Sequence, residues 1–222
     1  MGRITFPPIH LNKHMHIVDD QSPYYTRFSV PALDIILPWL QKNITNPQVC
    51  RDYPFTERPQ RDHHRKQIDL DEIWSHIPGK DIIPWSNTGT IFVTLPGGGS
   101  PLHRDRNVRG IEWDDNMGLN FPITVQDNCC QTRWVDDTVL KSYPDIEYSN
   151  MHTVRHYVER TGRVPTARSV SLGAHEVMLV NTAIWHSWHN NSPHTRIIMS
   201  LRVKENKKHW TFQRACEALF VN

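Results

Sequence analysis

Apolar positions recur at helical spacing in only a few stretches of this chain. The clearest stretch is residues 29–43, where four apolar side chains would share one helix face, with Pro38 expected to kink or interrupt the helix. These four side chains are Leu33, Ile36, Leu37 and Leu40. Short helices are also predicted at 69–76, with Asp69 as the cap, at 150–160 and at 209–221.

After Gly89 the pattern changes to short runs of β-branched and aromatic residues separated by turn residues. The predicted strands are 90–95, 119–125, 132–135, 169–172, 177–180, 185–189 and 195–203. Residues 1–28 read as an extended arm or short strands, and the charged, proline-containing segment 51–67 as an exposed loop. Helices followed by many short strands favour a mainly β sandwich or barrel with flanking helices.

Composition narrows the class of protein without naming a function. A chain of 222 residues with 38% hydrophobic content suits one domain. We expect an N-terminal elaboration at 1–88, a strand-rich core at 89–203 and a C-terminal helix at 204–222. The net charge of +2 argues for neither a membrane nor a nucleic-acid partner. The four cysteines lack CxxC spacing, and neither an apolar leader nor an 18-residue apolar run is present, so a cytoplasmic location is expected.

The 14 histidines direct attention to metal chemistry. His103 and Asp105 are two positions apart in a segment expected to be extended, so their side chains should point the same way. A turn signal at 190–193 suggests a hairpin that would place His186 opposite Arg196, which favours His186 as a third ligand. The histidines considered less suitable are His175, His189 and His194. Two histidines and one carboxylate form the facial triad of non-haem Fe(II) oxygenases.

Arg196 extends this interpretation to a second ligand. Its planar, permanently charged guanidinium is suited to hold a carboxylate through two hydrogen bonds. On the predicted strand Arg196 shares a face with Ile198, Ser200 and Arg202, so Ser200 could also contact a ligand there. A dicarboxylate that chelates iron at one end and pairs with arginine at the other would be 2-oxoglutarate.

Several motifs together resemble the Fe(II)/2-oxoglutarate-dependent oxygenase superfamily. They are His103-Arg104-Asp105, the Leu-Val-Asn-Thr run at 179–182, His186 followed by Asn190, Arg196 ten residues after His186, and Leu-Asn-Phe-Pro-Ile at 119–123. The sequence is most similar to the small prolyl-hydroxylase and aspartyl/asparaginyl-hydroxylase-like members. It departs from their pattern at Ile198, where a serine is usual, and at the bulky Trp188.

The resemblance implies a double-stranded β-helix, a jelly-roll and cupin-like core. It implies His103, Asp105 and His186 as catalytic ligands of Fe(II), and Arg196, with Asn120 and Ser200, as contacts of the co-substrate 2-oxoglutarate. The implied reaction uses O₂, is stimulated by ascorbate, and couples decarboxylation to succinate with hydroxylation of a C–H bond. The substrate would be a small molecule or a protein side chain, and the sequence identifies neither it nor the oligomeric state.

Two other classes of function fit parts of the sequence. The barrel could be a cupin-like metal or small-ligand binding module without oxygenase turnover. A basic rim formed by Arg104, Arg106, Arg109 and segment 51–66 could attract a nucleic acid. We favour this partner less, because the acidic side chains at 112–115 would pair with those arginines.

Overall fold

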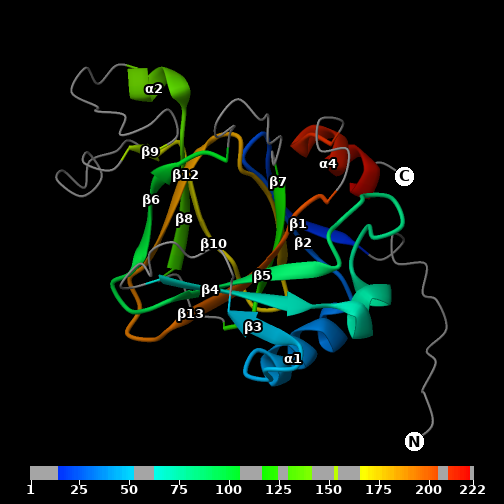
Figure 1. The fold of residues 1–222 in the computed structure, drawn as a ribbon. Coiled ribbons are helices and arrows are strands. Elements are labelled where there is room, and N and C mark those ends of the chain that lie inside the picture. The colour runs from blue at the N-terminus through cyan, green and yellow to red at the C-terminus, as the bar shows by residue number, and fades with distance from the viewer. Residues whose placement is uncertain are drawn as a thin grey trace, which may run out of the picture.

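Two antiparallel sheets face each other in the computed structural model of the chain (Figure 1), which describes residues 15–52, 63–105, 117–124, 130–141, 153–154, 166–204 and 210–220. The strands are β1 (His16–Gln21), β2 (Tyr25–Ser29), β3 (Cys50–Asp52), β4 (His63–Asp69), β5 (Thr88–Thr94), β6 (Gly99–His103), β7 (Met117–Pro122), β8 (Cys130–Val135), β9 (Thr153–Val154), β10 (Arg168–Ser171), β11 (Val177–Asn181), β12 (Trp185–Asn190) and β13 (Arg196–Leu201). The helices are α1 (Leu33–Asn43), the 3-10 helix η2 (Asp71–His76), α2 (Asp137–Lys141) and α4 (Phe212–Phe220).

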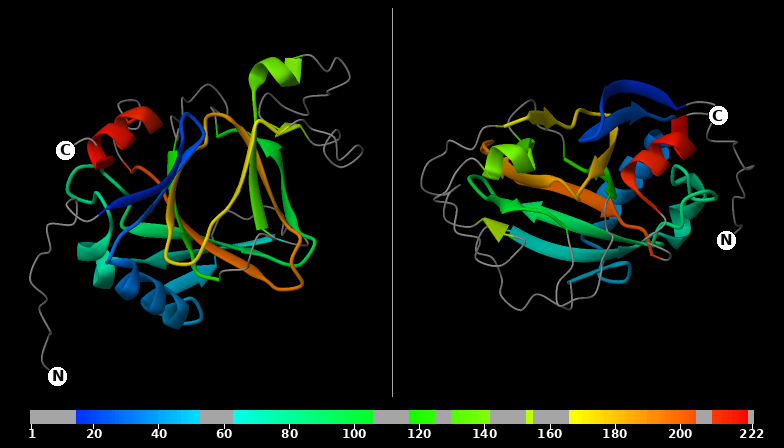
Figure 2. Two further views of the ribbon diagram at one scale, coloured as in Figure 1. Left: turned by 180° about the vertical axis from the view of Figure 1, so that it is seen from behind. Right: turned by 90° about the horizontal axis from the view of Figure 1, so that it is seen from above.

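The strand order identifies the core as a double-stranded β-helix. The larger sheet runs β1-β2-β11-β7-β13-β5-β4-β3 and the smaller one β10-β8-β12-β6-β9. Strands β5 to β8 alternate between the two sheets along the chain, and β10 to β13 fill the remaining places. Four strands of each sheet therefore interleave into a jelly-roll barrel, seen in two further orientations in Figure 2. The predicted fold class, mainly β with flanking helices and a cupin-like core, is confirmed.

The main hydrophobic core lies outside the barrel, between the larger sheet and the helices. Alternate residues of β13, Met199 and Leu201, join this core together with Leu119 and Phe121 of β7. Helix α1 contributes Leu33, Ile36, Leu37 and Leu40, and α4 contributes Phe212, Ala215 and Leu219. Because side chains alternate along a strand, the residues between these apolar positions point into the barrel. Polar side chains of β7 and β13 consequently face its interior.

A smaller apolar cluster fills one side of the interior, between the two sheets. Its central residue is the fully buried Trp134 of β8, whose ring packs against Tyr25 with the centroids 5.2 Å apart. Met178 and Val180 of β11 complete this contact between the sheets. The interior is thus apolar on the β8 and β11 side and polar along β13.

Three local predictions need correction. Helix α1 continues through Pro38, so the expected interruption is wrong; the buried apolar face holds the helix against the sheet. The predicted loop 51–67 begins and ends in strands β3 and β4, which pair with each other, although residues 53–62 lie outside the described part. In the predicted helix 150–160, Thr153 and Val154 form β9, which pairs with β6, while the remaining residues lie outside the described part.

The other helix predictions agree in outline. Asp69 ends β4, and its carboxylate accepts a hydrogen bond from the backbone N–H of Asp71 at 3.0 Å, at the start of η2. The predicted C-terminal helix is α4, and its Phe220 ring contacts Phe28 edge-on with a centroid distance of 5.0 Å. Within the described residues, no helix is long and apolar enough to cross a membrane.

Candidate metal centre

Pairing between β6 and β12 brings two histidines together at one end of the barrel. His103 and His186 are partners in the ladder, and their ring centroids are 4.4 Å apart. Asp105 lies two residues beyond the end of β6, where its backbone N–H donates to the carbonyl oxygen of Thr182 at 2.9 Å. Ligand atoms of His103, Asp105 and His186 all lie within 4.8 Å of one another, so this group could hold a metal ion.

Both imidazoles are oriented by contacts on the ring nitrogen that faces away from the group. Nδ1 of His103 is 3.1 Å from the hydroxyl of Ser100, and Nδ1 of His186 donates to the carbonyl oxygen of Ile184 at 2.9 Å. On His103 the other nitrogen, Nε2, lies 3.8 Å from Oδ1 of Asp105. Such contacts fix the direction of a metal-ligating histidine, and the carbonyl acceptor at His186 also fixes the tautomer with its proton on Nδ1.

The electrostatic state of the three side chains also suits a cation. Burial is the largest influence on His186 and lowers the pKa of its imidazole to about 3, so the ring is neutral near pH 7. Burial by itself would raise the pKa of Asp105, but the positive charge of Arg202, together with His186 and His103, lowers it overall. Neutral imidazoles and an ionised carboxylate are the forms that bind divalent metals.

The structure corrects the predicted hairpin that would place His186 opposite Arg196. Strand β12, which carries His186, belongs to the smaller sheet, and β13, which carries Arg196, belongs to the larger one. His186 pairs with His103 and Trp134, and Arg196 pairs with Thr94 of β5. The two residues are therefore not cross-strand neighbours, although both side chains belong to the barrel.

Asn190 explains why the chain crosses between sheets at this turn. Its side-chain N–H groups donate to the carbonyl oxygens of Thr94, in the larger sheet, at 3.0 Å and of His194 at 2.8 Å. Its Oδ1 accepts from the thiol of Cys130, in the smaller sheet, at 2.8 Å and from the Ser192 hydroxyl at 2.7 Å. One fully buried amide thus links both sheets and the turn between them.

The predicted co-substrate residues lie on the inner face of the larger sheet. Arg196 is only 7% exposed, and its guanidinium forms no hydrogen bond or ion pair with any residue in the described part of the chain. Burial lowers the pKa of Arg196 to about 10. Ser200 and Asn120 pair directly between β13 and β7, and the Ser200 hydroxyl and Asn120 Oδ1 are buried with no hydrogen-bond partner in the described segments of the chain.

Trp188 lies on the histidine side of the interior, as its position two residues after His186 predicted. Its ring contacts His103 edge-on with centroids 5.5 Å apart, and it contacts Phe92 of β5 in the same way at 5.7 Å. The indole therefore bridges the two sheets beside the histidine pair. This places the bulky departure from the family pattern next to a candidate ligand.

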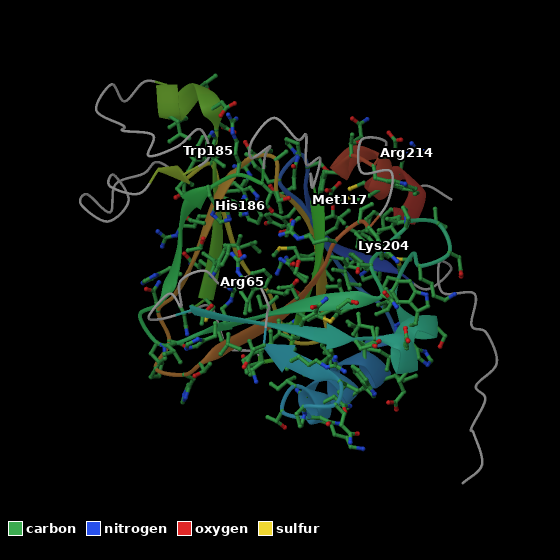
Figure 3. The ribbon with its side chains drawn as sticks, viewed as in Figure 1. Arg65, Met117, Trp185, His186, Lys204 and Arg214 are labelled. Carbon is green, nitrogen blue, oxygen red and sulfur yellow. The ribbon has the colours of Figure 1, made fainter. Side chains whose placement is uncertain are left out.

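Sequence reasoning assigned no role to Arg202 or Thr182. Arg202 had been placed on the face of β13 that carries Arg196, but nothing in the sequence showed that it reaches Asp105. In the structure Nη1 of Arg202 lies 3.0 Å from Asp105 Oδ2, and it also donates to the Thr182 hydroxyl at 3.1 Å. Figure 3 labels His186 on β12 and Met117 on β7, the strands on either side of this end of the barrel.

No protein-family model matches the chain, and no curated protein matches its sequence. Among solved structures, a deletion mutant of Bacillus subtilis oxalate decarboxylase matches 69% of this chain and 30% of its own chain, with 12% identity and a TM-score of 0.36. The Lactobacillus farciminis oxalate decarboxylase formate complex matches 66% of this chain and 30% of its own chain, with 10% identity and a TM-score of 0.37. Vicilin from Corylus avellana matches 66% of this chain and 30% of its own chain, with 6% identity and a TM-score of 0.36.

The aligned region spans less than a third of each of these longer chains, and TM-scores of this size carry no argument about function. The fold assignment rests on the strand order of the chain itself. The protein is a cupin-like jelly-roll barrel whose His103, Asp105 and His186 could together hold a metal ion.

Proposed function

We propose that this protein is an Fe(II)- and 2-oxoglutarate-dependent dioxygenase that hydroxylates its substrate. The proposal needs a metal-binding group with open coordination positions and a separate cationic group for the far carboxylate of the co-substrate. Both requirements have candidates on the inner surface of the barrel. The cationic group is Arg196, and it supports the binding of a carboxylate co-substrate in addition to a metal.

The donor set fits non-haem iron. Two neutral imidazoles and one carboxylate suit Fe(II) and also catalytic zinc, so the choice of iron rests on the co-substrate contacts described next. His103, Asp105 and His186 would hold the ion, with their outward nitrogens and Asp105 Oδ2 already engaged by neighbouring groups. When bound, the iron would supply the coupling of O₂ reduction and 2-oxoglutarate decarboxylation to C–H oxidation.

The burial of Arg196 without a partner among residues 15–52, 63–105, 117–124, 130–141, 153–154, 166–204 and 210–220 is the observation that carries the assignment of a carboxylate ligand. Leaving an ionised side chain buried and unpaired costs free energy, and proteins normally offset that cost by pairing. Even with its lowered pKa of about 10, Arg196 stays cationic near pH 7. A carboxylate bound through two hydrogen bonds would supply the missing partner.

Ser200 and Asn120 fit the same ligand. Their adjacent buried oxygens lie on the inner wall that also carries Arg196, because Arg196 and Ser200 are four positions apart on one face of β13. The Ser200 hydroxyl can donate to a ligand carboxylate, and the Asn120 amide can turn its N–H groups toward the ligand. A ligand there would satisfy polar groups that the protein leaves unpaired.

The test is the formation of succinate from 2-oxoglutarate by the purified protein with Fe(II), O₂ and ascorbate. We expect succinate above the metal-free background, with none from Asp105→Ala or Arg196→Met. Arg27→Met is the matched control, because the Arg27 side chain on β2 is already ion-paired with Asp19 and Glu176. Binding of metal without succinate from any substrate pool would contradict the proposal and favour a metal-binding module without turnover.

A further inference from the structure

Arg202 lies directly after β13 and reaches across the end of the barrel. Its Nη1 lies 3.0 Å from Asp105 Oδ2 and donates to the Thr182 hydroxyl at 3.1 Å and the Met117 carbonyl oxygen at 3.3 Å. We propose that Arg202 is a positioning residue that restricts Asp105 to one-oxygen ligation and so keeps three coordination positions open on the metal. This inference rests on the proposed metal site.

Asp105 depends on these contacts for its orientation. Strand β6 ends at His103, so no ladder hydrogen bond fixes the backbone of Asp105. Its backbone N–H is held by the Thr182 carbonyl at 2.9 Å, and its carboxylate also accepts a hydrogen bond from the Thr182 side chain. Thr182 is buried, at 2% exposure, and therefore forms a firm support between Asp105 and Arg202.

The two carboxylate oxygens of Asp105 have different surroundings. Oδ2 is engaged by Arg202, while Oδ1 is the oxygen that lies 3.8 Å from His103 Nε2. A carboxylate can bind a cation through one oxygen or two, and a guanidinium on one oxygen opposes the second mode by charge and by geometry. If each of the three protein ligands provides one donor atom, a six-coordinate ion has three coordination positions left open. A chelating 2-oxo acid and O₂ together require all three.

Arg202 is itself anchored, which a positioning role requires. Its backbone carbonyl accepts a hydrogen bond from the N–H of Ser86 at 2.8 Å. Its side chain is 28% exposed, like that of Asp105, so the ion pair is only partly screened by water. Arg196, six residues earlier on the same face, has no such partners among the residues that the structure describes. The two arginines therefore have different roles: Arg196 can bind a ligand, whereas Arg202 binds groups of the protein itself.

The experiment counts the water molecules on bound Mn(II) from the broadening of its electron paramagnetic resonance lines in H₂¹⁷O, alongside a Mn(II) titration. We expect three waters in the wild type and two in Arg202→Met, because the released carboxylate would bind through both oxygens. Mn(II) affinity should fall about 10- to 100-fold, as is typical when a residue that supports a ligand is removed. Arg202→Lys, which keeps a cation near Oδ2, should restore the third water.

Arg27→Met is the matched control, since Arg27 forms ion pairs of 3.2 Å with Asp19 and Glu176 and is 21% exposed. It should keep three waters and wild-type affinity. If Arg202→Met does not fold by circular dichroism, Thr182→Val removes the bridging hydroxyl with little change of shape, and it should lower the water count in the same direction.

Three waters and unchanged affinity in Arg202→Met would overturn the inference while leaving the metal site intact. A wild type that binds no Mn(II) would overturn both the inference and the proposed function. The expected water counts without any succinate formation would support the inference and contradict only the proposed dioxygenase activity.

Discussion

Ser200 on β13 and Asn120 on β7 are directly paired, and each carries a buried side-chain oxygen that no described residue contacts by a hydrogen bond. Unsatisfied polar atoms are uncommon inside proteins, and two on adjacent positions mark a surface built for something other than packing. The apolar core lies on the opposite face of the same strands. The polar inner wall is therefore separated from the residues that stabilise the fold.

Replacing Ser200 by alanine should weaken 2-oxoglutarate binding while leaving stability nearly unchanged. A net hydrogen bond contributes about 0.5–1.5 kcal/mol, which corresponds to a roughly 2- to 12-fold weaker affinity. Isothermal titration with 2-oxoglutarate and Mn(II) measures the change. Ser187→Ala is the control, because Ser187 alternates with His186 on β12 and points away from the interior. Equal affinities for the two variants would contradict a ligand contact by Ser200.

Arg196→Met should make the protein more stable and the ligand site non-functional. Replacing a buried, unpaired cation with an apolar side chain of similar length should raise the free energy of unfolding by about 1–3 kcal/mol. Loss of a charge-assisted pair should weaken 2-oxoglutarate binding by about 2–4 kcal/mol, or roughly 30- to 900-fold. Urea denaturation and calorimetric titration measure the two effects. A less stable variant would show that Arg196 contributes to the fold instead.

His186→Ala should abolish high-affinity Mn(II) binding, because it removes one of three ligands. The protein should stay folded, since the substitution removes only a small side-chain volume. The decrease should exceed the roughly 100-fold effect that is typical of a supporting residue. His189→Ala, three residues later on the same strand, should bind as the wild type does, since His189 is exposed. A weaker His189→Ala with an unaffected His186→Ala would reassign the ligand.

Asn190→Ala should destabilise the fold more than any surface change in the same turn. It removes the hydrogen bonds that the buried Asn190 amide makes with groups of both sheets, including the carbonyl oxygen of Thr94 and the thiol of Cys130. We expect a loss of about 3 kcal/mol or more in the free energy of unfolding. Asn191→Ala, at an exposed neighbouring position, should stay within about 0.5 kcal/mol of the wild type. Denaturant titrations of both variants decide this.

The raised pKa of Tyr25 predicts that the free energy of unfolding decreases at alkaline pH. Burial, together with a hydrogen bond to Asp19, raises the pKa of the Tyr25 phenol from 10.0 to about 12. The folded state therefore holds its proton where the unfolded state has lost it, and this stabilising contribution disappears as pH rises from 10.0 to about 12. Tyr25→Phe should lose less stability over that window in parallel urea titrations. Equal losses would show that Tyr25 is not the group responsible.

Much of the fold was predictable because strand patterns are local. The runs at Ile91 and Met199 contain enough β-branched and aromatic residues to identify strands, and the mainly β class follows from their number. The expected interruption at Pro38 was wrong because packing of the helix face outweighs one missing hydrogen bond. The local pattern predicts a helix at Thr153 and Val154, yet these residues pair with β6, a contact between segments distant in the chain.

The sequence by itself supplied His103, Asp105 and His186 as candidate ligands, from residue type, spacing and an expected hairpin that the structure corrects. Only the tertiary structure decided how they are supported. The turn after Asn190 passes from one sheet to the other, so His186 pairs with His103 and not with Arg196. Local sequence cannot specify this, because the choice depends on hydrogen bonds between Asn190 and strands far away in the chain. The contact of Arg202 with Asp105 has the same origin: closure of the barrel brings together residues that share no sequence pattern.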